Sequence, residues 1–322
     1  MTAIATRESY GEALKELGAL HEDVYVLDAD LSGATKTNGF ARQWPERFVS
    51  CGIAEANMID VAAGLSTLGL VPFASTFAMF AAGRGYEMIR NSIGYPHLNV
   101  KICATHGGIS VGEDGVSHQM NEDFALMRAI PGMVVMCPAD DVEARKMVQK
   151  ACEWKGPVYI RLGRAPVPVF HDENMEFEIG QAEQLRPGKD LTIIANGLLV
   201  HEALKAAQQL GAEGIDAGVL NMATIKPLDE EAVLQAAKAT GRILTAEEHS
   251  VIGGLGEAVS TCLSRNHPVK MRMVGINDVF GHSGPAAELL EEFGLTADHL
   301  VHEARELVKE PVQACGSQDS GK

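Results

Sequence analysis

The sequence predicts an α/β protein made of two doubly wound domains, each with a mainly parallel sheet between layers of helices. Three observations lead to this prediction. Short apolar runs rich in Val and Ile alternate with helical stretches over the first half of the chain. The alternation breaks at residues 165–189, and a second α/β pattern then begins. Near-continuous apolar strands separated by helices are typical of parallel sheets covered on both faces.

The first domain is expected over residues 1–165. A helix is predicted from Arg7 to Gly18 by its apolar spacing. The other elements follow from short apolar runs and helical stretches: strands at 23–31, 47–52, 71–75, 100–105, 133–137 and 157–163, and helices at 56–68, 79–93 and 141–153. The uncharged run from Val61 to Gly83 has the length of a membrane span, but Pro72 and several Gly, Ser and Thr residues divide it. We interpret this run as a buried helix, strand and helix.

A linker is expected at residues 166–189, where Pro, Gly and charged residues interrupt the pattern. The second domain follows over residues 190–310. Its predicted strands lie at 191–197, 215–222, 242–248 and 269–276, and a last helix runs from Ala297 to Lys309. Residues 311–322 are polar and are predicted to form a disordered tail.

Composition excludes several classes of function. The 322 residues suffice for two domains with their own cores, and the formal net charge is −16. Without a basic stripe, neither nucleic acid nor an anionic membrane is an expected partner, and an anionic substrate would need local arginines. The six cysteines show no CxxC spacing and no secretory signal is visible, so we expect a reduced, cytosolic setting.

The stretch from Thr105 to Gln119, THGGISVGEDGVSHQ, is the strongest candidate for a site. It is a polar, glycine-rich loop after an apolar strand, and so little side chain would let a ligand approach the backbone. His106 and His118 lack a third residue at a recognised metal-ligand spacing. We therefore favour proton transfer or substrate hydrogen bonding over a metal site. A flexible surface loop is the plainer alternative.

Glu55 stands where a strand gives way to an Ala-rich helix, with no basic residue within seven positions on either side. An isolated carboxyl among apolar residues can hold or share a proton, whereas the alternative is a first-turn glutamate favoured by the helix dipole. Phe77 and Phe80 are three residues apart and are expected on one helix face. Core packing is the commoner meaning of such a pair, and an aromatic pocket near Glu55 is the other.

Arginines offer a planar fork for phosphate or carboxylate, although a lone surface arginine is the plainer explanation. Arg161 and Arg164 end a predicted strand, and Arg7 opens the first helix. The glycine stretch at residues 252–258, IGGLGEA, lacks both GxGxxG and GK[ST] and is only a weak nucleotide signal.

In chain order, Arg7, DADL (28–31), GIAEANM (52–58), STFAMF (75–80), the loop at 105–119 and LGR (162–164) resemble the pyrimidine-binding domain of transketolase. The rest resembles the C-terminal domain of transketolase, including FGHSGPAAELLEEFGLT (280–296). The segment GEDG followed by Ser-His-Gln is a specific signature of thiamine-diphosphate enzymes. The chain lacks GDG followed by Asn, the motif with which that family binds metal and diphosphate.

The resemblance therefore implies the C-terminal subunit of a split, two-subunit transketolase. Its partner would be an N-terminal subunit carrying the diphosphate- and Mg²⁺-binding motif, in an α2β2 heterotetramer with thiamine diphosphate between unlike chains. The implied reaction moves a two-carbon ketol unit from a ketose phosphate to an aldose phosphate.

The resemblance also implies residue roles. Glu55 would hydrogen-bond a pyrimidine ring nitrogen and favour the imino tautomer, whose exocyclic nitrogen removes the thiazolium proton. Phe77 and Phe80 would hold the pyrimidine, Asp30 would lie near it, and His118 would assist proton transfers. On the substrate side, Asp114 would bind a ketose hydroxyl, and the sugar phosphate would be bound by Arg7, His106 and Arg164.

Several positions depart from the usual pattern of the family. Gly107 and Gly108 stand where Asp-Ser is frequent, Gly83 replaces a third aromatic residue, and Val116 replaces Pro. The serine expected to help bind phosphate falls near Ala34 and Thr35. These changes leave the cofactor residues in place and concern the acceptor sugar and its phosphate.

Three alternatives stay open. The chain could serve a transketolase for a branched or sulfonated sugar. It could be the β subunit of a 2-oxoacid dehydrogenase decarboxylating component, which would hand an acyl group to a lipoyl domain; the GEDG segment and the arginines disfavour this. It could also be a non-catalytic regulatory subunit, but such a subunit would not need to keep Glu55 and His118.

Overall fold

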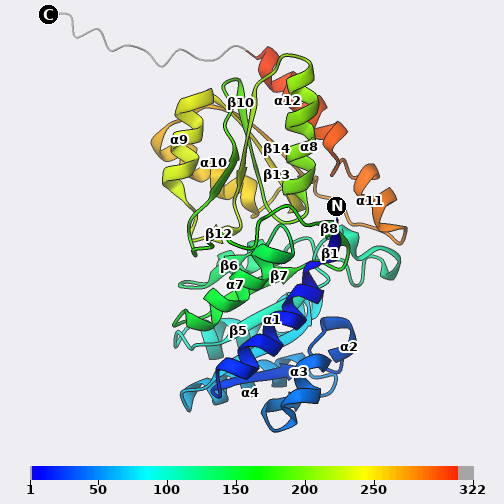
Figure 1. Cartoon of the computed structure of the whole chain (residues 1–322), viewed down its shortest axis with the longest axis vertical. Helices are drawn as coiled ribbons and strands as arrows, with labels where there is room; N and C mark the ends of the chain where they lie inside the picture. Colours follow the sequence, from blue (N-terminus) through cyan, green and yellow to red (C-terminus); the bar gives the residue numbers. More distant parts are fainter. Residues whose placement is uncertain (1, 311–322) are drawn as a thin grey trace, which may run out of the picture.

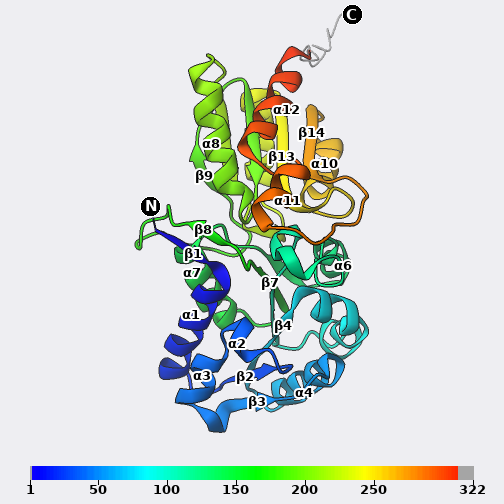
Figure 2. The same ribbon diagram turned by 90° about the vertical axis from the view of Figure 1, so that its right-hand side faces the viewer.

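The computed structural model describes residues 2–310 and shows an α/β chain with two doubly wound domains (Figures 1 and 2). The first domain contains a seven-stranded sheet in the order β12-β6-β7-β5-β4-β2-β3. Its strands are β2 (Val24–Asp28), β3 (Phe48–Ser50), β4 (Val71–Phe77), β5 (Lys101–Thr105), β6 (Val134–Met136), β7 (Val158–Leu162) and β12 (Thr224–Lys226). All neighbouring pairs are parallel except β12 with β6.

Alternate residues of these strands enter two separate cores, as the pleat of a strand requires. In β2, Val26 packs with α1 (Thr6–Leu20) and α7 (Asp141–Glu153) on one face. The next residue, Leu27, packs with α4 (Glu55–Thr67) and α6 (Asp123–Arg128) on the other face. Both faces are thus covered, and the sheet can present a ligand site only at its edges or at the ends of its strands.

The second domain contains a five-stranded sheet in the order β14-β13-β10-β11-β9. Its strands are β9 (Glu183–Arg186), β10 (Leu191–Ala195), β11 (Ala217–Asn221), β13 (Arg242–Ser250) and β14 (Lys270–Ile276), and only β9 is antiparallel to its neighbour. Helices α8 (Leu199–Ala212) and α12 (Ala297–Lys309) cover one face, and α9 (Glu230–Thr240) and α10 (Leu255–Asn266) cover the other (Figure 1).

The segment expected as a linker, residues 166–189, contains two strands. One is β9, and the other is β8 (Pro166–Pro168), which pairs with β1 (Ala3–Ala5) near the start of the chain. In addition, β12 comes from the second half of the sequence but pairs with β6 in the sheet of the first domain. The predicted tail at 311–322 lies outside the described residues.

The predicted helix at 79–93 forms with a different winding. Two π-helical segments, η2 (Met79–Arg84) and η3 (Ile89–Gly94), flank the short α5 (Tyr86–Met88). Phe77 is the last residue of β4, so the prediction that Phe77 and Phe80 share a helix face is wrong. The interpretation of the uncharged run as helix, strand and helix is confirmed. Within residues 2–310, no helix combines the length and apolar character needed to cross a bilayer.

The glycines of the loop at 105–119 allow the two domains to pack closely. A Cβ on Gly108, whose φ is +82°, would collide with the carboxyl group of Glu248, and a Cβ on Gly115 would collide with Ser283. Segment η4 (Ile109–Asp114) of this loop packs on α11 (Ala286–Glu292). At Gly108, Gly112 and Gly115 the space beside the glycine is filled by the second domain, and at Gly107 it is filled by Arg161. These glycines therefore serve packing, and the approach of a ligand to this loop stays a prediction.

The glycine stretch at 252–258 also serves the fold. Gly254 precedes α10, and the Glu247 carboxylate accepts hydrogen bonds from Leu255 N and Gly256 N, both at 2.7 Å. The anion position at this helix N-terminus is therefore occupied by a side chain of the protein.

Candidate active site

Several residues predicted to act lie at the carboxyl ends of the parallel strands of the first sheet. Asp30 follows β2, Phe77 ends β4, His106 follows β5 and Arg164 follows β7. This edge is where open α/β sheets bind ligands. Glu55 begins α4, which follows the neighbouring strand β3.

Glu55 is a buried carboxyl at a helix N-terminus, with 3% of the residue exposed. Its Oε2 lies 3.4 Å from Nη1 of Arg84, a residue that the sequence analysis did not identify. The Arg84 guanidinium also lies 4.8 Å from the centroid of the Phe80 ring. A signal for Arg84 was present, since it is the first charged residue after the uncharged run 61–83, but 29 residues separate it from Glu55.

Four of the predicted residues form one cluster of rings. Phe77 and Phe80 stack with centroids 5.8 Å apart and an interplanar angle of 13°. His106 stacks on Phe77 at 3.8 Å, and His118 meets Phe80 edge-on at 5.4 Å. The cluster is therefore an aromatic wall that carries two imidazoles.

His106 is neutral, and its protonation can be derived from its contacts. Arg7 Nη1 lies 3.0 Å from His106 Nε2, and a guanidinium can only donate, so Nε2 is the acceptor. Nδ1 then carries the proton and donates to Thr105 Oγ1 at 2.9 Å. Burial, reinforced by the charges of Arg7 and Arg164, lowers the pKa of His106 to about 3. His106 is consequently a hydrogen-bonding group and adds no positive charge at neutral pH.

Arg7 and Arg164 supply the cations near His106. Arg7 Nη1 also donates to Ala34 O at 3.2 Å, while its buried Nε has no hydrogen-bond partner within residues 2–310. Arg164 Nη1 lies 3.2 Å from Glu113 Oε2 and 3.7 Å from Asp114 Oδ2. Arg164 and Asp114 were both predicted to bind the substrate. In this structure they lie close together and form an ion pair with each other.

Arg161, also considered from the sequence, has a structural role. It is buried against Asp123, with Nε 2.9 Å from Oδ2, and it donates to the backbone carbonyl of Glu248 in the second domain. Its guanidinium lies over the Phe124 ring at 4.0 Å. Arg161 therefore joins the two domains from within and is not available to a ligand.

The loop after β2 is held by a residue that the sequence analysis missed. Asp28 is buried and accepts hydrogen bonds from Leu31 N at 2.6 Å, Thr35 Oγ1 at 2.6 Å and Thr37 Oγ1 at 3.0 Å. Thr35 lies near the position where the family was expected to have a phosphate-binding serine, and its hydroxyl donates to Asp28 instead. Asp30 is exposed with a φ of +65°, and it makes no side-chain hydrogen bond or ion pair among the described residues. Backbone strain of this kind is frequent at functional sites.

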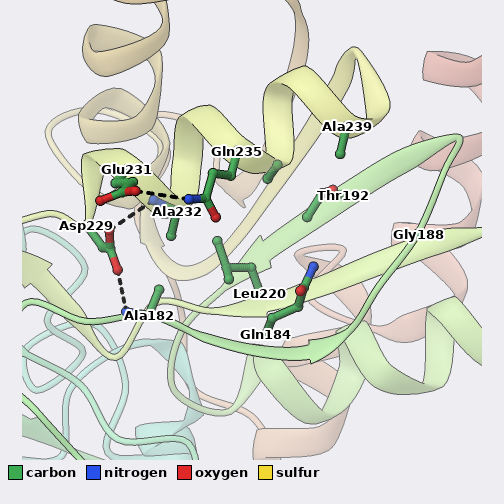
Figure 3. A pocket seen from close by; sticks show the side chains of 11 residues that line it. Ala182, Gln184, Gly188, Thr192, Leu220, Asp229, Glu231, Ala232, Gln235 and Ala239 are labelled. Atoms are coloured by element: carbon green, nitrogen blue, oxygen red, sulfur yellow. Dashed lines mark hydrogen bonds between the residues drawn. The ribbon is translucent and has the colours of Figure 1, made fainter.

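A cavity of about 330 Å³ opens where the two domains meet, and Met79 and Gln119, the sequence neighbours of Phe80 and His118, are among the residues that line it. Its lining combines both domains: Met79, Val116, Gln119, Asn121, Glu122, Ser250, Ile276, Asp278, Val279, Phe280 and Gly281. A separate cavity of about 440 Å³ lies between α9 and the edge of the second sheet (Figure 3). Asp229 at its mouth is already bonded to Ala182 N and Ala232 N, each at 2.9 Å. None of the residues predicted to act is among the residues that line either cavity.

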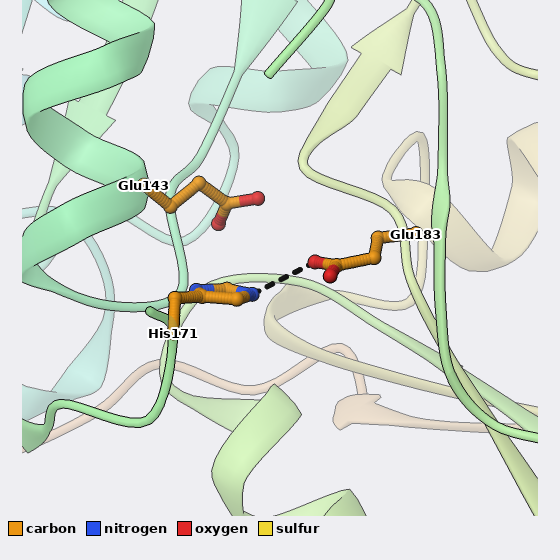
Figure 4. A group of neighbouring side chains, drawn as sticks. All are labelled: Glu143, His171 and Glu183. Atoms are coloured by element: carbon orange, nitrogen blue, oxygen red, sulfur yellow. Dashed lines mark hydrogen bonds and ion pairs between the residues drawn. The ribbon is translucent and has the colours of Figure 1, made fainter. Parts of the chain in front are cut away.

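Glu143, His171 and Glu183 bring metal-ligand atoms within 4.8 Å of one another (Figure 4). His171 Nε2 lies 2.8 Å from Glu183 Oε2, and its Nδ1 lies 3.0 Å from Asp140 Oδ1. Although burial alone would lower it, the bonds to Asp140 and Glu183 raise the pKa of His171 to about 10. We interpret the group as an ion network around an imidazolium, which ties His171 to the start of α7 and to β9.

Comparison with known proteins identifies both domains. The family model "Transketolase, pyrimidine binding domain" matches residues 2–169, and "Transketolase, C-terminal domain" matches residues 180–300. A protein of Methanocaldococcus jannaschii described as a transketolase C-terminal section is 51% identical over 306 residues, which cover 94% of this chain and 96% of the relative. The 6-deoxy-6-sulfo-D-fructose transketolase subunit of a Clostridium species is 45% identical over 303 residues, 94% of each chain.

A solved structure described as a split-gene transketolase in an inactive β4 tetramer is 55% identical, with a TM-score of 0.89, and covers 95% of this chain and 98% of the other. Human transketolase is 40% identical over 95% of this chain, and the match spans 49% of the human protein. The chain therefore belongs to the transketolase family, of which it contains the pyrimidine-binding and C-terminal domains.

Proposed function

We propose that this chain is one subunit of a thiamine-diphosphate-dependent transketolase, which moves a two-carbon ketol unit from a ketose phosphate to an aldose phosphate when a partner subunit is bound. One observation carries the proposal. The buried carboxyl of Glu55 lies beside the stacked rings of Phe77 and Phe80, with Arg84 bridging the two. A carboxyl next to an aromatic face suits an aminopyrimidine, because the ring can stack while a ring nitrogen shares a proton with the carboxyl.

The residues of the chain would act in distinct ways. When bound, thiamine diphosphate supplies a carbon nucleophile that attacks the ketose carbonyl. Glu55 would hold a proton at a pyrimidine nitrogen, and the ring cluster would exclude water from the pyrimidine. His118, partly exposed beside Phe80, would exchange protons with the substrate. Asp30 would lie near the pyrimidine, on the loop that Asp28 holds.

The substrate phosphate would bind at the cationic end of the site. Arg7 and Arg164 would contact the phosphate, and neutral His106, whose Nε2 accepts from Arg7, would take part by orienting Arg7 without adding charge. Asp114 would bind a ketose hydroxyl after releasing Arg164, to which it lies close in this structure. Arg7 Nε, a buried donor without a protein partner among the described residues, supports a ligand at this end.

The diphosphate and Mg²⁺ would be held by the partner. Mg²⁺ needs oxygen ligands in octahedral geometry, and this sequence lacks the GDG-and-Asn motif of the family. The match to human transketolase spans half of that protein, so a partner would supply the equivalent of the other half. We propose an α2β2 heterotetramer with the cofactor between unlike chains.

A second candidate is a transketolase for a sulfonated sugar. It is favoured by the 45% identity to the Clostridium subunit, which is named for 6-deoxy-6-sulfo-D-fructose. A sulfonate is an anion that Arg7 and Arg164 could bind in place of a phosphate. Comparing kcat/KM for xylulose 5-phosphate and for 6-deoxy-6-sulfofructose separates the two candidates.

The test is to mix the purified chain with a partner subunit that carries the GDG motif. Neither subunit alone should transfer ketol groups, and activity should appear on mixing with thiamine diphosphate and Mg²⁺. In the assembled enzyme, Glu55→Gln should lower the rate by about two to four orders of magnitude, because it deletes only the shared proton. Ketol transfer by the chain alone, or near wild-type turnover of the Glu55→Gln enzyme, would contradict the proposal.

A further inference from the structure

Arg84 contacts both groups that define the proposed pyrimidine site. Its Nη1 is 3.4 Å from Glu55 Oε2, and its Cζ is 4.8 Å from the Phe80 centroid. The two partners differ sharply in exposure, since 60% of the Arg84 side chain is exposed but only 4% of the Glu55 side chain. Arg84 therefore reaches a buried carboxyl from a side chain that is mostly exposed.

The π-helical segment η2 places Arg84 over Phe80. Residues four to five positions apart lie above one another in a helix with i to i+5 bonding, and Arg84 follows Phe80 by four. Gly83 leaves the space beside them open, because a Cβ there would meet only Met79 Cε at 3.8 Å. At position 85 a glycine is required by packing, since an added Cβ would lie 2.8 Å from Ala81 O.

Glu55 needs such a contact when no ligand is present. Within residues 2–310, Arg84 is the only side-chain hydrogen-bond or ion-pair partner of the Glu55 carboxyl. A buried carboxylate without a partner is costly, and the helix N-terminus offsets only part of that cost. Arg84 thus satisfies the carboxyl at the position where a ligand nitrogen would otherwise do so.

We propose that Arg84 is a placeholder for the pyrimidine ring, an inference that rests on the proposed function. A guanidinium is planar, donates N–H to the Glu55 carboxyl and stacks on an aromatic ring, and an aminopyrimidine does the same. The two cannot occupy the Glu55 and Phe80 contacts together. Arg84 therefore swings into solvent when the pyrimidine binds, and it acts as a positioning residue that keeps Glu55 paired until then.

Binding of an uncharged pyrimidine to the full chain tests the proposal. The probe is 4-amino-5-hydroxymethyl-2-methylpyrimidine, which lacks the thiazolium charge, so that loss of charge repulsion cannot explain a gain in affinity. Saturation-transfer NMR and a competition titration give the dissociation constant. Removal of the competing contacts in Arg84→Ala should lower this constant roughly five- to tenfold. Arg90→Ala is the matched control, because Arg90 is exposed and its side chain bonds only to Asn91 within residues 2–310.

A double-mutant cycle measures the pairing without a ligand. Arg84→Ala should lower the unfolding temperature of the full chain when Glu55 is present, and should have little effect in the Glu55→Gln background. Equal losses in both backgrounds would overturn the placeholder role. The placeholder role would also be overturned if the Arg84→Ala variant bound the pyrimidine no more tightly than the wild type, or if neither protein bound it detectably.

The outcomes separate this inference from the proposed function. If Glu55→Gln abolishes pyrimidine binding while Arg84→Ala leaves it unchanged, the cofactor site stands and the placeholder falls. If Arg84→Ala gains affinity that Glu55→Gln does not remove, the pyrimidine binds elsewhere, and both the placeholder role and the proposed role of Glu55 fall.

Discussion

At the scale of single residues, His106 shows how a neutral histidine can lie beside two arginines. It adopts a φ of +58° directly after β5 and stacks on Phe77. This conformation is unusual for a residue with a side chain and needs support from its surroundings. Arg7 and Thr105 provide that support through one hydrogen bond to each ring nitrogen. His106 therefore fixes the orientation of Arg7, and the arginines provide the charge for an anionic group.

Replacement of the two arginines should affect phosphorylated substrates selectively. In the assembled enzyme, Arg7→Ala and Arg164→Ala should each lower kcat/KM for sugar phosphates roughly ten- to a hundredfold, because a charge-assisted hydrogen bond contributes about 1.5 to 3 kcal/mol. Most of the loss should appear in KM if the contact is equal in ground and transition states.

The control is hydroxypyruvate with a neutral acceptor aldehyde, for which both variants should keep nearly wild-type rates. Equal losses with hydroxypyruvate and with sugar phosphates would mean that these arginines are structural.

At the scale of elements, long periodic segments were predictable and short ones were not. The helix at 141–153 was predicted with both ends correct. Its first turn is fixed by Asp140, which accepts a hydrogen bond from Glu143 N. By contrast, β12 and β9 have three and four residues and exist through pairing with strands distant in sequence. The π-helical winding at 79–94 was not predictable either, because α- and π-helices bury apolar residues at similar spacings.

The candidate site divides in the same way. The resemblance implied separate roles for Phe77 and Phe80, for His106 and for His118, and the contacts that join their four rings are seen only in the structure. The contact between Glu55 and Arg84 depends on how α4 and η2 pack, which no local pattern encodes. The glycine-rich loop was identified as important, but the reason lies in the second domain, which was invisible from the loop alone.

Gly108→Ala tests the explanation of that loop. The substitution adds a Cβ where φ is +82° and where the Glu248 carboxyl already lies. We expect the free energy of unfolding to fall by about 1 to 3 kcal/mol, measured by urea denaturation. Gly64→Ala is the matched control, because Gly64 lies in α4 with open space around it and should be neutral or slightly stabilised. Unchanged stability of Gly108→Ala would refute the packing role.

At the scale of the whole molecule, three buried carboxyl groups and one imidazolium each stabilise the fold less as pH rises, whereas His106 and His249, whose pKa values burial lowers, act in the opposite direction. Burial raises the pKa values of Glu143, Glu247 and Glu248 to about 7. Each folded-state value lies above the ordinary 4.5, so the stability that each group provides is complete below pH 4.5 and is lost as pH rises through 7. The pKa of His171 is raised from 6.5 to about 10, so the stability that His171 provides is also lost as pH rises between those two values. The net charge of −16 adds self-repulsion as carboxyls ionise.

Glu248→Gln should isolate one of these contributions, because Glu248 belongs to the second domain but accepts from Ser110 N in the first at 2.6 Å. A glutamine oxygen can accept the same bond without titrating. Relative to wild type, the variant should therefore gain about 1 to 3 kcal/mol in the free energy of unfolding between pH 5 and pH 8. Urea denaturation at both pH values measures the change, and Glu22→Gln, at an exposed site without an ion pair among the described residues, is the control. A pH profile of the Glu248→Gln variant parallel to that of the wild type would show that Glu248 stays ionised throughout, and that the contact between the domains does not depend on its protonation.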